Sequence, residues 1–315
     1  MDISIVIPLL NESESLVELS LKIDSVMKEN SFKYEVIYVD DGSDDDSWKI
    51  ISSICIENNS FKAIKFSKNY GKSQALHAGF EIADGNVVFT MDADLQDDPE
   101  EIPEMYNLII TKNLDILSGW KKKRFDPVLT KNLPSKIFNL SARLTSGIKL
   151  NDFNCGLKGY KNEVVKNINV YGEMHRYIPI LASNEGYNKI EEKVIKHRPR
   201  KYGQTKFGMS RFSHGFLDLV TIWFLSRFGK RPMHFFGTIG ALMLIIGFMF
   251  ALYLGIDKVY LNPEGRLITE KPEFFISLTT MILGSQFFVA GFLGEMITRN
   301  NQNKKQYKID QKINS

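Results

Sequence analysis

Two carboxylates one residue apart form the most informative feature of this chain. Asp92 and Asp94 follow a strand-like apolar run at 87–90. Side chains at i and i+2 of an extended segment point to the same side, so both carboxylates can approach one hard divalent cation. Such a cation commonly bridges phosphate oxygens, and Gln96 offers a further oxygen ligand. Because Asp-x-Asp also occurs on solvated loops, the interpretation depends on the elements around it.

The first half of the chain alternates strand-like and helix-like segments. Apolar runs at 3–7, 34–39, 63–66 and 87–90 are separated by segments with helical spacing at 12–28, 48–57 and 74–83. This alternation predicts an α/β fold whose mainly parallel sheet is covered on both faces, with ligands bound beyond the carboxyl ends of the strands. Polar motifs at 8–12, 40–43, 69–72 and 92–94 stand at or beyond those ends. The sequence therefore predicts that four segments meet at one edge of the sheet.

Length, cysteine content and charge narrow the class of protein. The 315 residues can form one sizeable domain and a smaller part. Cys55 and Cys155 provide neither a disulfide framework nor metal-ligand spacing, and no secretory signal precedes the first strand-like run. We therefore expect the catalytic part in a reducing cytoplasm. A net charge of +3 is too small to indicate a nucleic-acid partner.

Two uncharged segments near the C-terminus, at 235–256 and 274–294, are each long enough to cross a bilayer. Two buried core helices are the alternative, but soluble helices seldom lack charge around their whole circumference. Basic residues precede the first segment and follow the second: Arg227, Lys230, Arg231, Arg299, Lys304, Lys305 and Lys308. The positive-inside rule then predicts a multi-pass protein of the cytoplasmic (inner) membrane, with both termini and the catalytic domain in the cytoplasm.

Two further segments have an amphipathic pattern. Residues 131–147 fit a helix on the membrane surface and also a helix packed on protein. Residues 207–230 directly precede the first span and carry Arg211, Trp223 and Arg227, which suit a headgroup layer. The tail at 300–315 is polar and basic, and we expect it to be mobile.

Four motifs occur in the order seen in family 2 glycosyltransferases: PLLNE at 8–12, DDGS at 40–43, DADLQ at 92–96 and RKYGQTK at 200–206. Further matches at 151–158, 172–176 and 231–237 extend the similarity over nearly the whole chain. The chain resembles in particular the polyprenyl-phosphate glycosyltransferases, the group of dolichol-phosphate mannose synthases and bacterial undecaprenyl-phosphate sugar transferases. The resemblance implies a GT-A catalytic domain at 1–206, a juxtamembrane helix at 207–230, a transmembrane hairpin at 231–299 and a cytoplasmic tail at 300–315.

The resemblance also implies which residues bind the donor, a UDP- or GDP-sugar. Pro8, Glu12 and Asp41 would contact base and ribose, and Asp40 would support their loop. A helix cap near residue 12 and a tight turn at 41–42 are structural roles compatible with these contacts. A second set would hold Mg²⁺ or Mn²⁺ on the leaving diphosphate: Asp92, Asp94 and Gln96.

The acceptor, a lipid monophosphate, must approach an anionic donor, so fixed cations must offset the repulsion. The clusters at 121–124 and 197–206 offer them, although such charge runs also suit solvated faces or contacts with lipid headgroups. The family match favours Arg200 and Lys206, followed by Arg124, as phosphate ligands. Family members often carry an arginine just before the first cluster, where this chain has Trp120 and Lys121; lysine supplies charge without a bidentate fork.

Asp152 is the candidate for the residue beside the attacking phosphate. A phosphate whose second pKa is about 6 is largely ionised at neutral pH, so Asp152 could act as a base or simply orient the nucleophile. A loop-capping aspartate is the alternative. His175 and Arg176 fit acceptor-site groups and ordinary helix residues equally well.

Together these features predict an inverting transfer of one sugar to a polyprenyl phosphate, undecaprenyl phosphate if the source is bacterial, at the cytoplasmic face of the membrane. Its product would serve a cell-envelope glycan, and the resemblance to bacterial members favours a homotetramer. One alternative is a processive polysaccharide synthase, which the lack of a Gln-x-x-Arg-Trp motif and the small number of spans disfavour. The other is a non-catalytic adaptor that binds nucleotide sugar or lipid, which the intact carboxylates disfavour.

Overall fold

The structure is a computed structural model that describes residues 1–122, 139–140, 142–144, 146–170, 172, 174–199, 201–202, 224, 228, 231–300 and 309–313. The chain divides into two compact units. The first comprises Met1–Trp223 together with Lys305–Ser315, and the second comprises Phe224–Lys304. Most of the amphipathic segments predicted at 131–147 and 207–230 lies outside the described residues.

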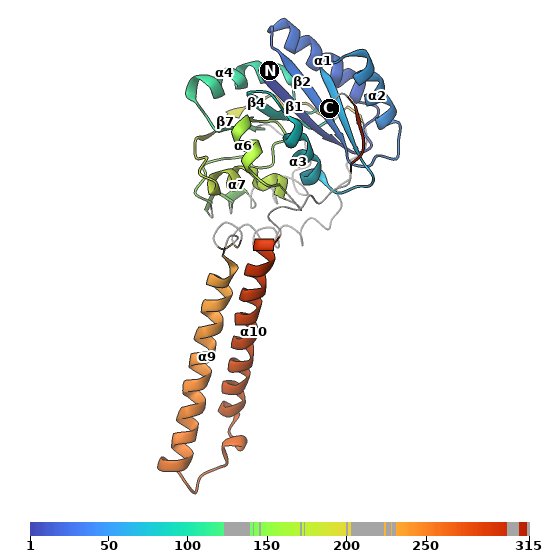
Figure 1. Ribbon diagram of the computed structural model, residues 1–315. Coiled ribbons are helices and arrows are strands. Elements are labelled where there is room, and N and C mark those ends of the chain that lie inside the picture. Colours follow the sequence, from blue (N-terminus) through green and yellow to red (C-terminus); the bar gives the residue numbers. More distant parts are fainter. Residues whose placement is uncertain are drawn as a thin grey trace. The chain divides into compact units, whose positions relative to one another are not determined.

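The first unit is built on one mixed sheet with the strand order β7-β5-β6-β4-β1-β2-β3-β8. Figure 1 shows its central strands β4, β1 and β2 next to one another. Its centre is parallel: β1 (Ile3–Leu9) lies between β2 (Tyr34–Asp40) and β4 (Val87–Thr90), and β2 also pairs with β3 (Phe61–Phe66). Beyond β4, the strand β6 (Lys158–Lys161) runs antiparallel to both β4 and β5 (Ile116–Trp120), and β7 (Ile190–Val194) pairs in parallel with β5. The polar motifs that follow β1, β2 and β4 therefore lie at one edge, as predicted.

Helices cover both faces of this sheet. Apolar residues of α1 (Leu16–Glu29), α2 (Ser47–Glu57) and α4 (Ile102–Lys112) join the alternate residues Ile3, Ile5 and Ile7 of β1 in one buried cluster. Val6 faces the other side, where α3 (Lys72–Ile82) packs so closely that a Cβ at Gly79 would lie 2.3 Å from Val6 Cγ1. Shorter helical elements complete the unit: η1 (Pro99–Glu101), α6 (Asn162–Asn167), η3 (Met174–Tyr177) and α7 (Ile178–Asn184).

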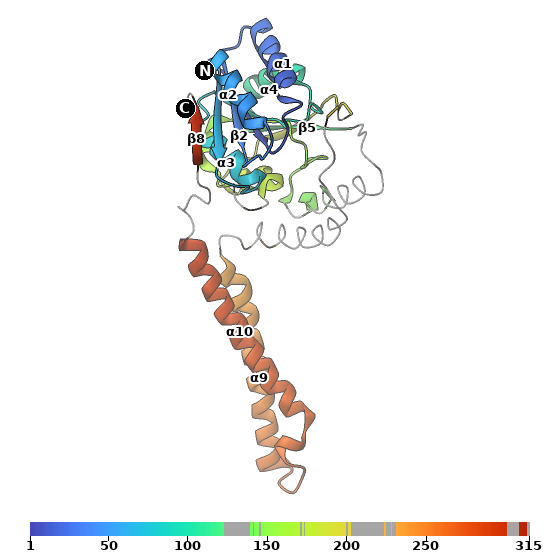
Figure 2. The same cartoon turned by 90° about the vertical axis from the view of Figure 1, so that its right-hand side faces the viewer.

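A strand from the tail completes the edge of the sheet. The sequence predicts a mobile tail, but β8 (Ile309–Ile313) pairs antiparallel with β3 (Figure 2). Lys65 is opposite Gln311, and Ile313 packs against the buried cluster. The open edge of β3 offers unpaired backbone groups, which even a polar segment can pair with, because the pairing uses the backbone rather than side chains.

The second unit is a helical hairpin of α9 (Pro232–Ile256) and α10 (Pro272–Asn300), whose connection contains the short turns η4 (Asp257–Leu261) and η5 (Ile268–Glu270). Glycines permit close approach of the two helices: a Cβ at Gly240 would lie 2.6 Å from the Gly284 carbonyl oxygen. Both helices are long and apolar enough to cross a membrane, with mean hydropathies of 2.4 and 1.6, and only 17% of the most apolar stretch of each is buried. A core helix of a soluble protein would be mostly buried. The low burial of α9 and α10 therefore supports the prediction that both span a membrane.

Candidate active site

The turn after β2 is fixed by its two aspartates. Asp40 Oδ1 accepts a hydrogen bond from the Ser43 amide at 2.8 Å. The Asp41 carboxylate accepts from the amides of Tyr70 and Gly71 at 2.7 and 2.9 Å, which ties this turn to the loop before α3. Burial raises the pKa of Asp41 to about 6 in spite of these two hydrogen bonds. Asp41 thus has a structural role at the position predicted to contact the nucleoside.

The loop after β1 is held against this turn. The Asn11 amide donates to Ser43 Oγ at 2.9 Å, and the Glu12 amide donates to Ser47 Oγ at 3.0 Å. Gly42 has a φ of +78°, and a Cβ there would lie 2.5 Å from the Lys68 carbonyl carbon, so only glycine fits without a shift. The two loops predicted to bind the nucleoside therefore form one connected wall.

Asp92, Asp94 and Gln96 follow β4 and are all partly exposed, whereas the intervening Ala93 and the following Asp97 are buried. The backbone turns at Leu95, which has a φ of +60°, and the Gln96 amide donates to Asp94 Oδ1 at 3.2 Å. Asp94 and Gln96 thus lie in one turn that closely follows Asp92.

The two carboxylates differ in their electrostatic environment. Asp92 forms an ion pair with Lys72 at 2.5 Å. Burial by itself would raise the pKa of Asp92, but Lys72 and Lys121 outweigh it and lower the pKa to about 2. The pKa of Asp94 rises to about 6 because its carboxylate is partly desolvated and lies near the charges of Asp92 and Asp97.

These carboxylates fit a divalent cation, because a cation would relieve the excess of negative charge around Asp94. No group of three His, Cys, Asp or Glu side chains suited to a metal occurs in the described part of the chain. The protein would therefore supply two carboxylates and an amide oxygen. This small ligand set leaves coordination positions for phosphate oxygens, as is usual for Mg²⁺ bound with a nucleotide.

Lys121 contacts the loop that carries Asp92 and Asp94, through an ion pair with Asp97. Its Nζ is 2.6 Å from Asp97 Oδ1, and the two side chains are 12% and 0% exposed. Burial would lower the pKa of Lys121, but Asp97, Cys155 and Asp92 raise it, so the ammonium stays charged. The structure gives this lysine a carboxylate partner, and its predicted contact with the acceptor phosphate stays a prediction.

The start of the second basic cluster lies along the same loop. His197 forms an antiparallel bridge with Asp97, and the Arg198 amide donates to the Gln96 carbonyl at 2.9 Å. Arg198 also forms a 2.5 Å ion pair with Asp98. The other predicted phosphate ligands, Arg124, Arg200 and Lys206, lie outside the described residues.

Asp152 is 1% exposed, and its Oδ1 accepts from the Asn154 amide at 3.1 Å. This is the loop-capping geometry that the sequence left open. The residues after it, at 153–156, line a pocket that also reaches Asp92. Asp152 therefore organises the loop between itself and the predicted metal site.

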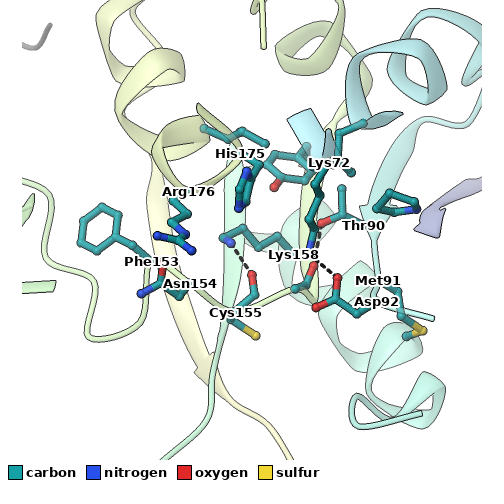
Figure 3. A pocket seen from close by; sticks show the side chains of 15 residues that line it. Lys72, Thr90, Met91, Asp92, Phe153, Asn154, Cys155, Lys158, His175 and Arg176 are labelled. Atoms are coloured by element: carbon teal, nitrogen blue, oxygen red, sulfur yellow. Dashed lines mark hydrogen bonds and ion pairs between the residues drawn. The ribbon is translucent and has the colours of Figure 1, made fainter. Parts of the chain in front are cut away.

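This pocket is small, about 20 Å³ in volume, and partly open to solvent; Figure 3 shows the side chains that line it. Its charged side chains and its histidine come from four places: Lys72 at the start of α3, Asp92 after β4, Lys158 in β6, and His175 and Arg176 in η3. Lys158 is 4% exposed and donates to the Cys155 carbonyl. Sequence reasoning left Lys72 and Lys158 out of the site, although both belong to motifs that it singled out, and it left the role of Arg176 open.

Two pKa shifts in the pocket have the same cause. Burial lowers the pKa of Lys158, and the charge of Lys72 adds to the effect, although Cys155, Asp152 and Asp92 oppose it. Burial also lowers the pKa of His175 well below its usual value, together with the nearby charges of Lys72 and Arg176. His175 is therefore neutral at physiological pH.

The loop at 153–156, which lines the pocket, packs directly on the Asp92 carboxylate through Gly156. Thr90 Oγ1 donates to the Gly156 carbonyl at 2.8 Å. A Cβ at Gly156 would lie 2.5 Å from Asp92 Oδ2, so the site leaves no room for a side chain there. The orientation of Asp92 thus depends on a glycine that is distant in sequence.

The protein has a mainly parallel sheet covered by helices, with an Asp-x-Asp loop and a cationic pocket at the ends of its strands. This combination is typical of the GT-A class of fold. Residues 4–168 match the profile described as "Glycosyl transferase family 2", and the chain belongs to that family. A solved structure with 17% identity, glucosyl-3-phosphoglycerate synthase from Mycobacterium tuberculosis in complex with Mn²⁺ and UDP-glucose, gives a TM-score of 0.56 and covers 72% of this chain and 79% of its own. This similarity confirms the predicted fold.

Two curated relatives resemble the chain over almost its whole length. Dodecaprenyl-phosphate galacturonate synthase from Rhizobium johnstonii is 34% identical over 304 residues, which cover 95% of this chain and 88% of the relative. Undecaprenyl-phosphate 4-deoxy-4-formamido-L-arabinose transferase from Pseudomonas syringae pv. syringae is 32% identical over 302 residues, with 94% and 86% covered. Both are named as polyprenyl-phosphate sugar-transferring enzymes, the group that the sequence motifs indicated.

Proposed function

We propose that this protein is an enzyme that transfers one sugar from a nucleotide-sugar donor to the phosphate of a polyprenyl phosphate, with inversion at the anomeric carbon. The observation that carries the proposal is the near full-length similarity to relatives named for such acceptors, which includes the hairpin as well as the GT-A unit. The hairpin would anchor the enzyme in the membrane that contains its lipid acceptor. Basic flanks favour a cytoplasmic location of the catalytic unit and both termini.

The donor would bind across the loops after β1, β2 and β4. Pro8, Glu12 and Asp41 would contact the nucleoside of a UDP- or GDP-sugar, with Asp40 fixing the turn through Ser43. Mg²⁺ or Mn²⁺, held by Asp92, Asp94 and Gln96, would supply Lewis-acid stabilisation of the leaving diphosphate. The excess negative charge around Asp94 supports this assignment.

The acceptor phosphate would attack the anomeric carbon directly. Because it is largely ionised near pH 7, the protein must position it more than deprotonate it. Asp152, which is 1% exposed, is better suited to orienting the neighbouring loop and cations than to exchanging a proton with water. The remaining predicted phosphate contacts are Arg124, Arg200, Lys206 and, through its charge, Lys121. A homotetramer remains part of the proposal.

The test is an assay of purified protein with radiolabelled UDP- and GDP-sugars, polyprenyl phosphate, and Mg²⁺ or Mn²⁺. The proposal expects an organic-extractable lipid that carries one sugar and that does not form after addition of EDTA. A labelled polymer would instead identify a processive synthase. If no donor in the panel gave any incorporation, the result would instead indicate a non-catalytic adaptor.

The donor panel also decides between UDP and GDP and names the sugar. Lys206→Ala serves as an acceptor-site variant, with the exposed Lys49→Gln on α2 as the matched control. The first should raise the KM for polyprenyl phosphate, whereas the control should not. Unchanged acceptor kinetics in Lys206→Ala would remove Lys206 from the site.

A further inference from the structure

The predicted metal ligand Asp92 is already paired with a cation of the protein itself. Lys72 Nζ lies 2.5 Å from Asp92 Oδ1, and Figure 3 shows the two side chains pointing toward one another. They are 37% and 33% exposed, so dissolved ions can reach both. A divalent cation at Asp92 and the ammonium of Lys72 would therefore compete for the same carboxylate.

The Asp92 carboxylate has little freedom to serve both cations at once. Gly156 packs on it so closely that an added Cβ would lie 2.5 Å from Oδ2 and 3.0 Å from Oδ1. This contact hinders the carboxylate from turning to separate a metal ion from the lysine. Two cations beside one carboxylate also repel each other. We therefore expect a bound metal to displace the ammonium of Lys72.

The backbone at Lys72 is anchored on both sides, so the displacement is left to its side chain. Asp41 accepts a hydrogen bond from the Gly71 amide at 2.9 Å, and Ser73 Oγ accepts one from the His175 amide at 2.9 Å. The flexible four-carbon stem of a lysine lets the ammonium swing while its Cα stays in place. A displaced ammonium thus stays within the length of one side chain of its present position beside Asp92.

The charges around Lys72 favour a new anionic partner once a metal has taken its place. Lys158 lies close enough that the charge of Lys72 contributes to the lowered pKa of Lys158. Without its carboxylate, Lys72 would face this cation and the metal, which is unfavourable unless an anion arrives. Under the proposed function, on which this inference rests, the diphosphate of the donor binds with the metal and supplies that anion.

We propose that Lys72 is an internal counter-ion that neutralises Asp92 until the donor binds, and that it then pairs with the donor diphosphate. The lysine thereby opposes binding of a metal ion alone and favours binding of the metal together with the diphosphate. By linkage, metal and nucleotide raise each other's affinity by the same factor, and Lys72 supplies part of that factor. A free metal ion would then seldom occupy the site without its substrate.

Mn²⁺ binding to the purified full-length protein in detergent tests the proposal without turnover. Electron paramagnetic resonance measures free Mn²⁺ with no nucleotide, with UDP and with GDP. Lys72→Met should bind Mn²⁺ alone about 10-fold more tightly than the unsubstituted protein, and should lose most of the gain in affinity that the nucleotide gives. Lys72→Arg keeps the positive charge and should retain both properties. The control Lys112→Met removes a 2.6 Å ion pair with Glu191 and should match the unsubstituted protein.

Thermal unfolding gives a second readout. Without metal, Lys72→Met should have a lower unfolding midpoint than Lys112→Met, because it removes the partner of Asp92. Saturating Mn²⁺ should close this difference, since the metal replaces the lysine.

Two results would overturn the proposal: Mn²⁺ affinity and nucleotide coupling in Lys72→Met equal to those of the control, or no Mn²⁺ binding by any of the proteins. If Lys72→Met does not fold, Lys72→Gln is measured in its place. The expected changes in Mn²⁺ binding without any lipid product would refute only the proposed function.

Discussion

Replacing Gly156 by alanine should disturb the metal site while leaving the fold intact. The new Cβ would lie 2.5 Å from Asp92 Oδ2 and 2.7 Å from Asp92 Cγ. Because unstrained contacts between such atoms need about 3.5 Å, the carboxylate must withdraw by about 1 Å. A displacement of about 1 Å at a reacting centre costs about 100-fold in rate, which corresponds to about 2.7 kcal/mol of transition-state stabilisation.

The assay for Gly156→Ala measures kcat/KM for sugar transfer together with a Mn²⁺ titration. We expect about a 100-fold lower kcat/KM and a higher Mn²⁺ concentration at half-maximal rate, with the thermal unfolding midpoint nearly unchanged. Gly255→Ala is the matched control, because no atom lies within 4 Å of its added Cβ. Wild-type kcat/KM and an unchanged Mn²⁺ titration in Gly156→Ala would refute the argument that Asp92 must keep this orientation to hold the metal.

Three other substitutions test separate parts of the structure. Asp94→Asn should abolish metal-dependent transfer while the protein still inserts into membranes, and substantial remaining turnover would contradict the metal assignment. Gly42→Ala should destabilise the first unit by about 2–4 kcal/mol, because it combines a positive φ with a 2.5 Å approach to the Lys68 backbone; an unchanged thermal midpoint would disprove this reasoning. Ile313→Asp should weaken the pairing of β8 and speed amide hydrogen exchange in residues 63–66, whereas wild-type exchange there would show that β8 does not protect this edge.

The centre of the fold and half of the site follow from local sequence patterns. The buried runs that form β1, β2 and β4 are strongly apolar and separated by helical periodicity, so a parallel sheet is expected. Since parallel strands share one carboxyl edge, the proximity of Asp41 to the Asp92 loop is expected as well. These predictions need only the order of elements along the chain.

The pocket could not be predicted from the sequence, because its residues are brought together by long-range contacts that local patterns do not reveal. β6 runs antiparallel to β4 and places Lys158 opposite Thr90, although 67 positions separate the two residues along the chain. With only four residues, β6 has no periodic signal, so the position of Lys158 could not be predicted. The ion pair of Lys72 with Asp92 likewise depends on how α3 packs on the sheet. The five residues of β8 were missed because their mixture of isoleucine and polar residues is typical of a tail.

The return of the chain from α10 to β8 has a practical consequence for work on the catalytic unit. This unit is discontinuous in sequence, since residues 305–315 belong to it although the hairpin precedes them. A soluble version cut at residue 206 would lose β8 and expose the backbone of β3, a ready template for aggregation. Joining the two parts with a flexible linker in place of the hairpin would instead keep the sheet closed at this edge.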